Sequence, residues 1–486
     1  TGQVPTYLIG SDAFQECDTV GITRHCTKHN YLVKRVEDLP RIIHEAFYVA
    51  SNGRPGPVVI DIPKDVQFAK GKYERPTNSE HKTYRPRVDG DVAQIERAIE
   101  LMTKAKKPIF YTGGGVINAG PAASATLRQL VRATGYPITS TLMGLGAYPA
   151  SDPQWLGMLG MHGTYEANMA MHDCDVMICV GARFDDRITG RLDAFSPKSK
   201  KIHIDIDPSS INKTVKVDVP IIGDAGRVLS EMMRLWTEKK PKLETEAHKA
   251  WWGQISTWRA RNCLAYKRSE TEIKPQYAVE RLYALTKNRD TYITTEVGQH
   301  QMWAAQFLHF EQPNRWMSSG GLGTMGYGLP AAVGVQKAHP QSLVVCVAGE
   351  ASVLMNMQEM STAAQYRLPI KIFILNNEYM GMVRQWQELL HGGRYSNSYS
   401  EALPDFVKLA EAYHAKGIRC SDPSELDAKI QEMIDYPGPV LFDCLVTKQE
   451  NCFPMIPSGK AHNEMILPDF SGDTGEIIDA KGKQLV

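Results

Sequence analysis

Hydrophobic and polar positions alternate along this chain as short buried strands and amphipathic helices. From Asp38 the pattern is that of a capped helix with Pro40 in its first turn and Gly53 placed to end it. The apolar run 57–62 that follows is typical of a buried parallel strand. The same rhythm predicts strands at 108–111, 137–142, 175–180 and 201–206, a helix near 122–134, and a further strand and helix alternation over 276–450. This pattern predicts an α/β fold of doubly wound parallel sheets.

Polar segments divide the chain into three blocks. Residues 76–92 carry prolines and charges and are predicted to be a linker. Residues 236–275 are rich in Lys, Glu and Trp, which predicts a connecting helical segment with a solvated surface. The predicted division is 1–75, 76–92, 93–235, 236–275, 276–465 and a tail over 466–486. The first block is small for an α/β domain and the chain begins at Thr1, so we expect that domain to be incomplete, with a piece missing upstream.

The composition favours small-molecule chemistry. With 43% hydrophobic and 22% charged residues the chain resembles an ordinary globular protein. Its 55 basic and 54 acidic residues nearly cancel, so no net field favours nucleic acid or an acidic membrane. Nine scattered cysteines without a Cys-x-x-Cys pair are interpreted as reduced packing residues, and no apolar run is long enough to span a bilayer. We expect a cytoplasmic protein, although the missing start leaves a plastid or mitochondrial address open.

The third block carries the strongest chemical pattern. A strand at 343–348 precedes Gly349 and Glu350, a helix is predicted across 355–367, and a strand at 370–375 precedes Asn376 and Asn377. Because parallel strands bring their carboxyl ends to one edge of the sheet, Glu350 and Asn377 should lie close together. A carboxylate and a carboxamide suit magnesium, and Gly349 allows backbone to approach a phosphate. The sequence therefore predicts a magnesium and diphosphate site.

The spacing of this pattern carries a resemblance to a known family. Glu350 and Asn377 lie 377 − 350 = 27 residues apart, which resembles the signature of thiamine diphosphate enzymes with Glu in place of the usual Asp. Together with the segments 1–5, 320–330, 349–359 and 376–386, the chain resembles the large catalytic subunit of acetohydroxyacid synthases, also called acetolactate synthases, as far as about residue 465. The resemblance implies the C-terminal part of a pyrimidine-binding domain, a central FAD-binding domain and a diphosphate- and magnesium-binding domain, in that order.

The resemblance also implies where the cofactors lie. Met325 would prop thiamine diphosphate into a bent shape, and Tyr379 would offer its backbone carbonyl to the metal. The implied positions for this cofactor are Glu296, Val297, Gly298, Gln299, His300, Gly323, Met325, Gly349, Glu350, Ala351, Ser352, Asn377 and Tyr379, with Glu350, Asn377 and Tyr379 on magnesium. FAD, bound without redox turnover, would meet Arg54, Gly113, Gly114, Thr141, Leu142, Met143, Met161, His162, Gly181, Arg183, Asp185, Asp205, Ile206, Gly223 and Asp224. Glycines suit a pyrophosphate, and acidic residues suit ribose hydroxyls.

The implied reaction is decarboxylation of pyruvate and its condensation with a second 2-keto acid, which gives acetolactate or acetohydroxybutyrate in branched-chain amino acid biosynthesis. Arg187 would clamp the second carboxylate, a task that suits a planar bidentate cation. Met382 and Trp386 would shape the acceptor pocket, although residues four apart on a helix are also typical of a core pair. The remaining matches are Phe14, Gln15 and Lys28 on the substrate side of a partner subunit's site, and Lys64 near its entrance.

Partners and alternatives follow from the same resemblance. We expect a homodimer or homotetramer, a small regulatory subunit, 2-keto acid substrates, and neither nucleic acid nor membrane as a partner. The family carries its activating glutamate upstream of the segment that matches Thr1, so no residue here is assigned that role and we expect residues 1–486 alone to turn over little. The alternatives are a pyruvate oxidase, a glyoxylate carboligase and a non-catalytic flavin-binding fragment.

Overall fold

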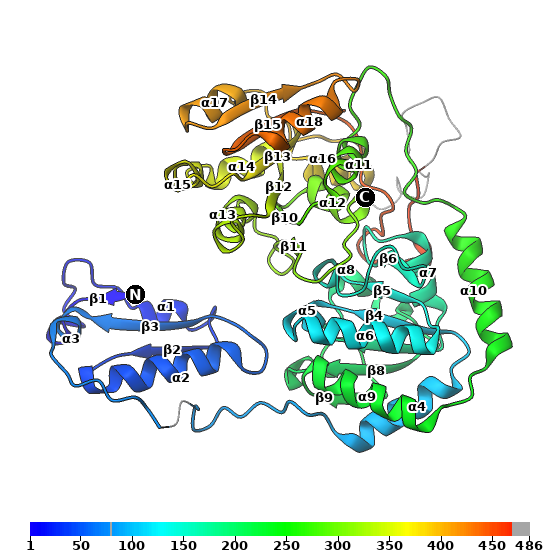
Figure 1. Cartoon of the computed structure of the whole chain (residues 1–486), viewed down its shortest axis with the longest axis horizontal. Coiled ribbons are helices and arrows are strands. Elements are labelled where there is room, and N and C mark those ends of the chain that lie inside the picture. The colour runs from blue at the N-terminus through cyan, green and yellow to red at the C-terminus, as the bar shows by residue number, and fades with distance from the viewer. Residues whose placement is uncertain (78–79, 469–486) are drawn as a thin grey trace.

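The computed structural model describes residues 1–77 and 80–468 and contains three separate parallel sheets (Figure 1). Each sheet is built by one of the three blocks of the chain, and helices pack against its strands. The predicted α/β fold with three parallel sheets is therefore confirmed. Most of the predicted tail, residues 469–486, lies outside the described part of the chain.

The first sheet is the smallest, with strand order β1-β3-β2. Its elements are β1 (Gly2–Gln3), η1 (Thr6–Leu8), α1 (Thr19–Thr23), β2 (His29–Leu32), η2 (Val36–Asp38), α2 (Leu39–Ser51), β3 (Val58–Pro63) and α3 (Lys64–Phe68). The predicted helix from Asp38 and the strand at 57–62 correspond to α2 and β3. Val33, Ile42 and Val66 form its small core. Residues 69–77 and 80–88, between this sheet and the second one, form neither helix nor strand (Figure 1).

The second sheet has strand order β6-β5-β4-β7-β8-β9. Its elements are α4 (Val92–Lys104), β4 (Pro108–Thr112), α5 (Gly114–Asn118), α6 (Pro121–Thr134), β5 (Ile138–Ser140), η3 (Leu142–Gly144), β6 (Trp155–Met158), α7 (Tyr165–Asp173), β7 (Val176–Val180), α8 (Asp186–Thr189), η4 (Leu192–Ala194), β8 (Lys200–Asp205), η5 (Pro208–Ser210), β9 (Val219–Ile222), α9 (Ala225–Lys239) and α10 (Thr245–Arg259). Successive strands are added outward on either side of β4 and β7. The order therefore reverses between these two strands, where open α/β sheets bind ligands.

The third sheet has strand order β11-β10-β12-β13-β15-β14. Its elements are α11 (Pro275–Thr286), β10 (Thr291–Thr295), α12 (Gln299–Phe307), β11 (Trp316–Met317), α13 (Gly328–Ala338), β12 (Leu343–Gly349), α14 (Glu350–Val353), η6 (Leu354–Asn356), α15 (Glu359–Gln365), β13 (Lys371–Asn376), α16 (Gly381–Leu390), α17 (Phe406–Ala412), β14 (Lys416–Cys420), α18 (Leu426–Asp435), β15 (Val440–Leu445) and η7 (His462–Glu464). Alternate residues of β12 and β13 enter the two cores on opposite faces of this sheet.

Two predictions about local structure are wrong, and a third is right only in part. The continuous helix expected across 355–367 is instead α14, η6 and α15, and Asn356 in this broken stretch donates from its Nδ2 to Gly326 O at 2.6 Å. The connecting helix α10 is not a solvated surface on all sides, because Trp251 and Trp258 are buried against the second sheet. Among the cysteines, Cys17 and Cys26 are exposed rather than packed.

None of the helices in the described ranges 1–77 and 80–468 combines the length and the apolar character that a bilayer crossing requires.

Candidate active site

The carboxyl ends of β12 and β13, which are adjacent parallel strands, form the edge of the third sheet at which magnesium is predicted, called the metal edge below. Glu350 follows β12 directly, and Asn377 follows β13, as the strand pattern predicts. Glu350 is only 1% exposed, and its Oε1 has no hydrogen-bond partner among the described residues. Burial raises the pKa of this carboxyl to about 8. A buried carboxyl oxygen without a partner is costly, so this position favours occupation by a cation.

Asn377 and Tyr379 sit in the turn that follows β13. Tyr379 N donates to Asn377 Oδ1 at 3.1 Å. Tyr379 forms an antiparallel bridge with Tyr399. The hydrogen bonds of this bridge are made by the residues on either side of the pair, as in the bond from Met380 N to Ser398 O. The carbonyl of Tyr379 therefore points away from the 398–400 segment, on the same side as its own N–H. The 398–400 segment therefore leaves this carbonyl available for the predicted role of backbone ligand.

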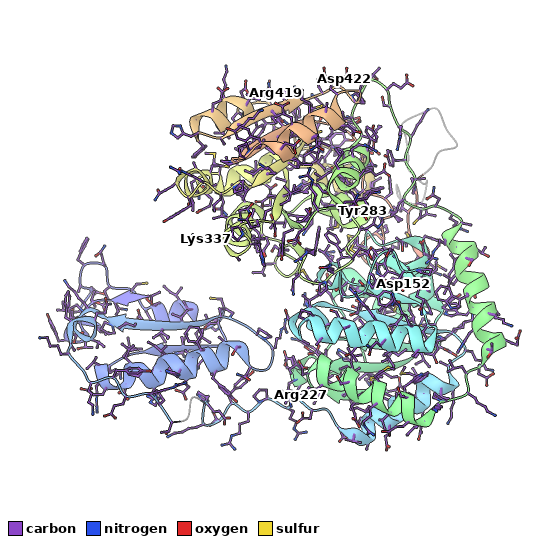
Figure 2. The ribbon with its side chains drawn as sticks, in the orientation of Figure 1. Asp152, Arg227, Tyr283, Lys337, Arg419 and Asp422 are labelled. Carbon is purple, nitrogen blue, oxygen red and sulfur yellow. The ribbon has the colours of Figure 1, made fainter. Side chains whose placement is uncertain are left out.

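The buried carboxylate of Asp443 holds this turn in place. Asn376 Nδ2 donates to Asp443 Oδ1 and Arg419 Nε donates to Asp443 Oδ2, each at 2.9 Å. Arg419 lies on β14 at the outer edge of the sheet (Figure 2). The ion pair leaves the buried Asp443 compensated, so the turn that carries Asn377 is anchored to two strands.

His300 lies beside the metal edge in the first turn of α12. A Cβ added at Gly349 would lie 2.7 Å from His300 Nδ1, so the ring packs directly on that glycine. His300 Nε2 is buried and has no partner in the described part of the chain, and burial lowers the pKa of the imidazole to about 3. A neutral imidazole with a free ring nitrogen can donate to a phosphate oxygen.

Glu296 does not direct its carboxylate toward this edge. Its two oxygens accept from Gly326 N and from Leu329 N, and the side chain is fully buried. Burial raises the pKa of the Glu296 carboxyl, while these backbone donors act in the opposite sense. The side chain therefore holds the 326–329 loop, and only its backbone is available to a diphosphate.

The other positions expected around thiamine diphosphate lie on the loops that border the same edge. Val297 and Gly298 follow β10, Gly323 and Met325 lie in the loop before α13, and Ala351 and Ser352 lie in α14. A Cβ at Gly323 would meet only Val297 within 4 Å, so this loop and the end of β10 are close neighbours. The loop after β10 and the loop before α13 thus meet at this edge.

The donor set suits magnesium with a diphosphate. Across residues 1–77 and 80–468 no three His, Cys, Asp or Glu side chains gather as a metal cluster. Magnesium does not need such a cluster, because it is usually held by one or two carboxylates and completes its shell with waters and phosphate oxygens. The unpartnered atoms Glu350 Oε1 and His300 Nε2 meet the two needs of a magnesium diphosphate, a cation ligand and an anion donor.

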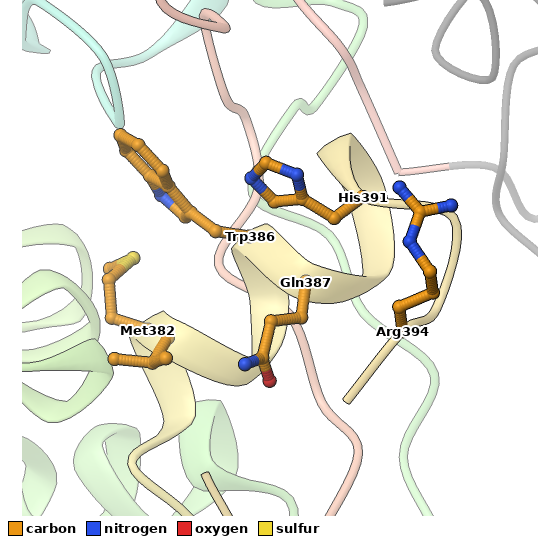
Figure 3. A pocket seen from close by; sticks show the side chains of 6 residues that line it. Met382, Trp386, Gln387, His391 and Arg394 are labelled. Carbon is orange, nitrogen blue, oxygen red and sulfur yellow. The ribbon is translucent and has the colours of Figure 1, made fainter. Parts of the chain in front are cut away.

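A cavity of about 530 Å³ opens beside α16 (Figure 3). Met382 and Trp386, both predicted for an acceptor pocket, line it with four other residues. The guanidinium carbon of Arg187 lies 5.9 Å from the centre of the Trp386 ring. The structure thus brings together a predicted residue of α8, beside the second sheet, and one of α16, beside the third sheet. His391 and Arg394 also line the cavity and were missed. They follow Trp386 closely in sequence, but only the fold shows which way they point.

The positions expected to bind FAD gather at the carboxyl edge of the second sheet. They follow all six of its strands: Gly113 and Gly114 after β4, Thr141 to Met143 after β5, Met161 and His162 after β6, Gly181, Arg183 and Asp185 after β7, Asp205 and Ile206 at β8, and Gly223 and Asp224 after β9. Gly113 and Gly181 lie at the ends of β4 and β7, where the strand order reverses. This is the location at which such a sheet binds a dinucleotide.

Replacing Gly113 with alanine should destabilise this edge, because the added Cβ would lie 2.5 Å from Gly181 O. We expect a loss of about 1–3 kcal/mol in the free energy of unfolding. The matched control is Gly253→Ala in α10, where a Cβ meets nothing within 4 Å and should be neutral or slightly stabilising. Urea unfolding of the two variants measures both effects on stability. Equal stability of the two variants would contradict the prediction.

Several acidic residues at this edge already have local partners. Asp224 accepts from Arg227 N at the start of α9, and Asp185 accepts from Arg187 N at the start of α8. Both therefore cap helices and retain only part of their capacity for a ribose. Arg54, which comes from the first block, reaches this edge through an ion pair with Asp207 at 3.3 Å.

His162 and His462 are buried histidines that join the second sheet to the C-terminal segment. His162 Nδ1 lies 3.1 Å from Pro454 O, and His462 Nε2 lies 2.6 Å from Ile188 O. Burial lowers the pKa of each imidazole from 6.5 to about 4. Both rings are therefore neutral in the folded protein at neutral pH.

This neutrality predicts a loss of stability in acid. Because the unfolded chain takes up these protons near pH 6.5 and the folded chain only near pH 4, the free energy of unfolding should fall as pH drops through this window. The slope is about 1.4 kcal/mol per histidine per pH unit. His462→Gln keeps a donor for Ile188 O and should flatten the fall in urea midpoint between pH 6.5 and pH 4.5. A variant with the parent's full pH dependence would disprove this origin.

The substrate-side residues predicted in the first block, unlike Arg54, do not join the other predicted residues within one chain. Phe14 is 90% exposed, Gln15 has a left-handed backbone with φ of 68°, and Lys64 is exposed. Lys28 is engaged locally, since its Nζ donates to Asn52 O at 2.8 Å and to Tyr84 Oη at 3.2 Å. The sheet that carries them lies apart from the third sheet (Figure 1). A second subunit would have to bring these residues to the metal edge.

Two domain models of thiamine enzymes match the chain. The model described as "Thiamine pyrophosphate enzyme, central domain" matches residues 95–232, and "Thiamine pyrophosphate enzyme, C-terminal TPP binding domain" matches residues 296–444. These ranges coincide with the second and third sheets. The fold, the metal edge and these matches define the chain as a thiamine diphosphate enzyme.

Relatives narrow the class further. The chain is 50% identical over 472 residues to acetolactate synthase isozyme 3 large subunit of Escherichia coli (strain K12), which covers 96% of this chain and 82% of that protein. It is 50% identical over 470 residues to acetolactate synthase large subunit of Haemophilus influenzae and 46% identical over 469 residues to that of Pyropia yezoensis, with 96% of this chain covered in each case and 81% and 78% of the relative. The chain belongs to the family of acetolactate synthase large subunits.

Proposed function

We propose that the protein decarboxylates pyruvate on thiamine diphosphate and joins the two-carbon unit to a second 2-keto acid, pyruvate or 2-ketobutyrate. Acetolactate or acetohydroxybutyrate is then the product, as a step of branched-chain amino acid biosynthesis. The observation that carries this proposal is the contact of Arg187 with the ring of Trp386, which lines the cavity beside α16, a helix that starts just after the Asn377 turn. The guanidinium of Arg187 can bind a carboxylate, and the indole of Trp386 beside it suits a short apolar side chain, so together they suit a small 2-keto acid.

The residues at the metal edge divide the work of binding. Glu350, Asn377 and the carbonyl of Tyr379 are the proposed magnesium ligands, and His300 Nε2 is a proposed donor to the diphosphate. Bound thiamine diphosphate supplies the carbanion stabilisation that decarboxylation of a 2-keto acid needs. Arg187 would orient the carboxylate of the acceptor, and its geometry makes a bidentate contact available. Met382 and Trp386 would exclude water and limit the acceptor's size.

FAD and the partners complete the proposal. FAD would occupy the carboxyl edge of the second sheet, where Gly113 and Gly181 let the backbone segments after β4 and β7 pack closely at the point of strand-order reversal. The three sheets are proposed to mark three domains, over 1–75, 93–235 and 276–465, joined by the linkers given above. At least a homodimer is proposed, because the first sheet must come from a second subunit to place Gln15 and Lys28 at the metal edge. A small regulatory subunit is a further proposed partner, since the relatives are named large subunits.

The product identifies the function. The protein, supplied with the upstream segment that the family resemblance leads us to expect, is incubated with magnesium, thiamine diphosphate, FAD and pyruvate, and the product is read by proton NMR. Acetolactate is the expected result. Acetate with peroxide would instead assign an oxidase, and acetaldehyde alone would assign a decarboxylase.

A further inference from the structure

Three buried carboxamides connect α16 to the metal edge. Gln385 lies on α16 and is fully buried, Gln299 opens α12, and Asn377 follows β13. Gln299 Nε2 donates to Gln385 Oε1 at 2.9 Å, and Asn377 Nδ2 donates to Gln299 Oε1 at 3.2 Å. The chain of contacts thus runs from the helix that lines the cavity to a proposed magnesium ligand.

The direction of these hydrogen bonds is fixed by the backbone. Cys452 N can only donate, and it donates to Gln385 Oε1 at 2.8 Å, while Gln385 Nε2 donates to Cys452 O at 3.1 Å. Gln385 must therefore present its oxygen to Gln299, which presents its own nitrogen there and to Glu450 O at 2.9 Å. Gln299 Oε1 then faces Asn377 and accepts from its Nδ2. The oxygen of Asn377 is left to face the opposite side.

We propose that Gln385 is a positioning residue that, through Gln299, orients the amide of Asn377 so that its oxygen faces the metal. The proposal rests on the proposed function, because it concerns the magnesium ligand of that site. Tyr379 N also donates to Asn377 Oδ1, but this bond moves with the turn itself. The bonds through Gln299 and Gln385 tie the turn to α12, to α16 and to residues 450–452.

A glycine makes the close approach possible. A Cβ added at Gly381, the first residue of α16, would lie 2.0 Å from Gln299 Oε1 and 2.9 Å from Asn377 Nδ2. Any side chain at this position would separate the two amides. The helix that carries Met382 and Trp386 therefore begins beside the hydrogen bond that orients Asn377. This position couples the wall of the cavity to the metal edge.

The test is the magnesium affinity of Gln385→Met, which keeps the length of the side chain and removes its polar atoms. Magnesium chloride is titrated in the presence of thiamine diphosphate and followed by intrinsic tryptophan fluorescence. We expect binding to weaken by about 10- to 100-fold, the usual effect of losing a residue that supports a metal ligand. The Gln385→Glu variant keeps an acceptor for Cys452 N and Gln299 Nε2, and in its protonated form it also keeps a donor for Cys452 O, so it should recover most of the loss at a pH at which this buried carboxyl is neutral.

The matched control is Gln336→Met in α13. Gln336 is also fully buried and donates to two backbone carbonyls, His339 O at 3.0 Å and Ser342 O at 3.1 Å, so the change should lower the melting temperature in a similar way. It should leave magnesium affinity at the parent value. Equal weakening in both variants, or parent affinity in Gln385→Met, would overturn the proposal. Where Gln385→Met does not fold, Gly381→Ala replaces it with the same expected loss, and parent affinity there would also overturn it.

The same titration separates this proposal from the proposed function. A parent protein that binds magnesium with thiamine diphosphate, beside a Gln385→Met variant that binds equally well, rejects only the positioning role. A parent protein that binds no magnesium with thiamine diphosphate rejects the proposed function and the positioning role with it.

Discussion

Replacing Glu350 with glutamine should abolish magnesium-dependent binding of thiamine diphosphate. The substitution keeps the size of the side chain and removes the single charge among the three proposed ligands. Residues that only support a metal ligand change affinity by about 10- to 100-fold, so the loss of a charged ligand should exceed about 100-fold. Isothermal titration of the cofactor with and without magnesium chloride measures the effect. Unchanged magnesium-dependent binding would remove Glu350 from the metal site.

The stability of the same variant distinguishes a ligand from a structural carboxylate. Glu350 Oε1 has no partner within the described residues and its side chain is buried, so the metal-free fold gains little from its charge. Glu350→Gln should therefore unfold at the parent temperature or above it when magnesium is absent. Asp443→Asn is the contrasting control, because it removes a buried charge that pairs with Arg419 and should lower the melting temperature clearly. A marked loss of stability in Glu350→Gln would indicate a structural role.

The metal edge could be predicted because it follows from a rule about strands. Glu350 and Asn377 each follow a buried apolar run, and parallel strands of one sheet end at the same edge. β6 and β9 were not predicted: β6 contains Gly157, and β9 contains Pro220, which a strand tolerates only at a sheet edge such as the one it occupies. Their short runs resemble loops when read without their neighbours.

Contacts between distant segments could not be predicted from local pattern. In the sequence, Gln385 is one polar residue on a predicted amphipathic helix. Only the packing of α16 on residues 450–452 shows that its side chain is buried and hydrogen-bonded to Gln299. The broken helix at 355–367 has a similar cause, since Asn356 is held by Gly326 O from another loop. Helical periodicity records the local preference and carries no information on such partners.

The expected role of Lys28 comes from the family resemblance alone, because neither motif spacing nor hydrophobic periodicity indicates it. Nothing in the sequence around Lys28 distinguishes it from an ordinary surface lysine. Within one chain it donates to the end of α2 and to Tyr84. Its expected role depends on a second subunit. The structure of one chain explains its local contacts, whereas its part in the reaction stays a prediction that an assembled dimer must test.

Replacing Trp386 with leucine should change which 2-keto acid accepts the two-carbon unit. Trp386 lines the cavity of about 530 Å³, and its ring lies 5.9 Å from the guanidinium carbon of Arg187, so it limits the space beside the residue proposed to hold the acceptor's carboxylate. One methylene distinguishes 2-ketobutyrate from pyruvate, and a hydrophobic pocket discriminates such a difference by about 1–3 kcal/mol, or 10- to 200-fold. Removal of the indole should erase much of that preference.

The ratio of acetohydroxybutyrate to acetolactate, measured by NMR from an equimolar mixture of the two acids, reads this preference directly. It does so independently of the total rate, because both products share the decarboxylation step and differ only in the acceptor. Trp252→Leu is the matched control: it makes the same change on α10, where the indole donates to Gly135 O and is remote from the cavity. A Trp386→Leu variant with the parent's product ratio would assign the indole to packing, and the selection between acceptors would then have to reside in Arg187 or Met382.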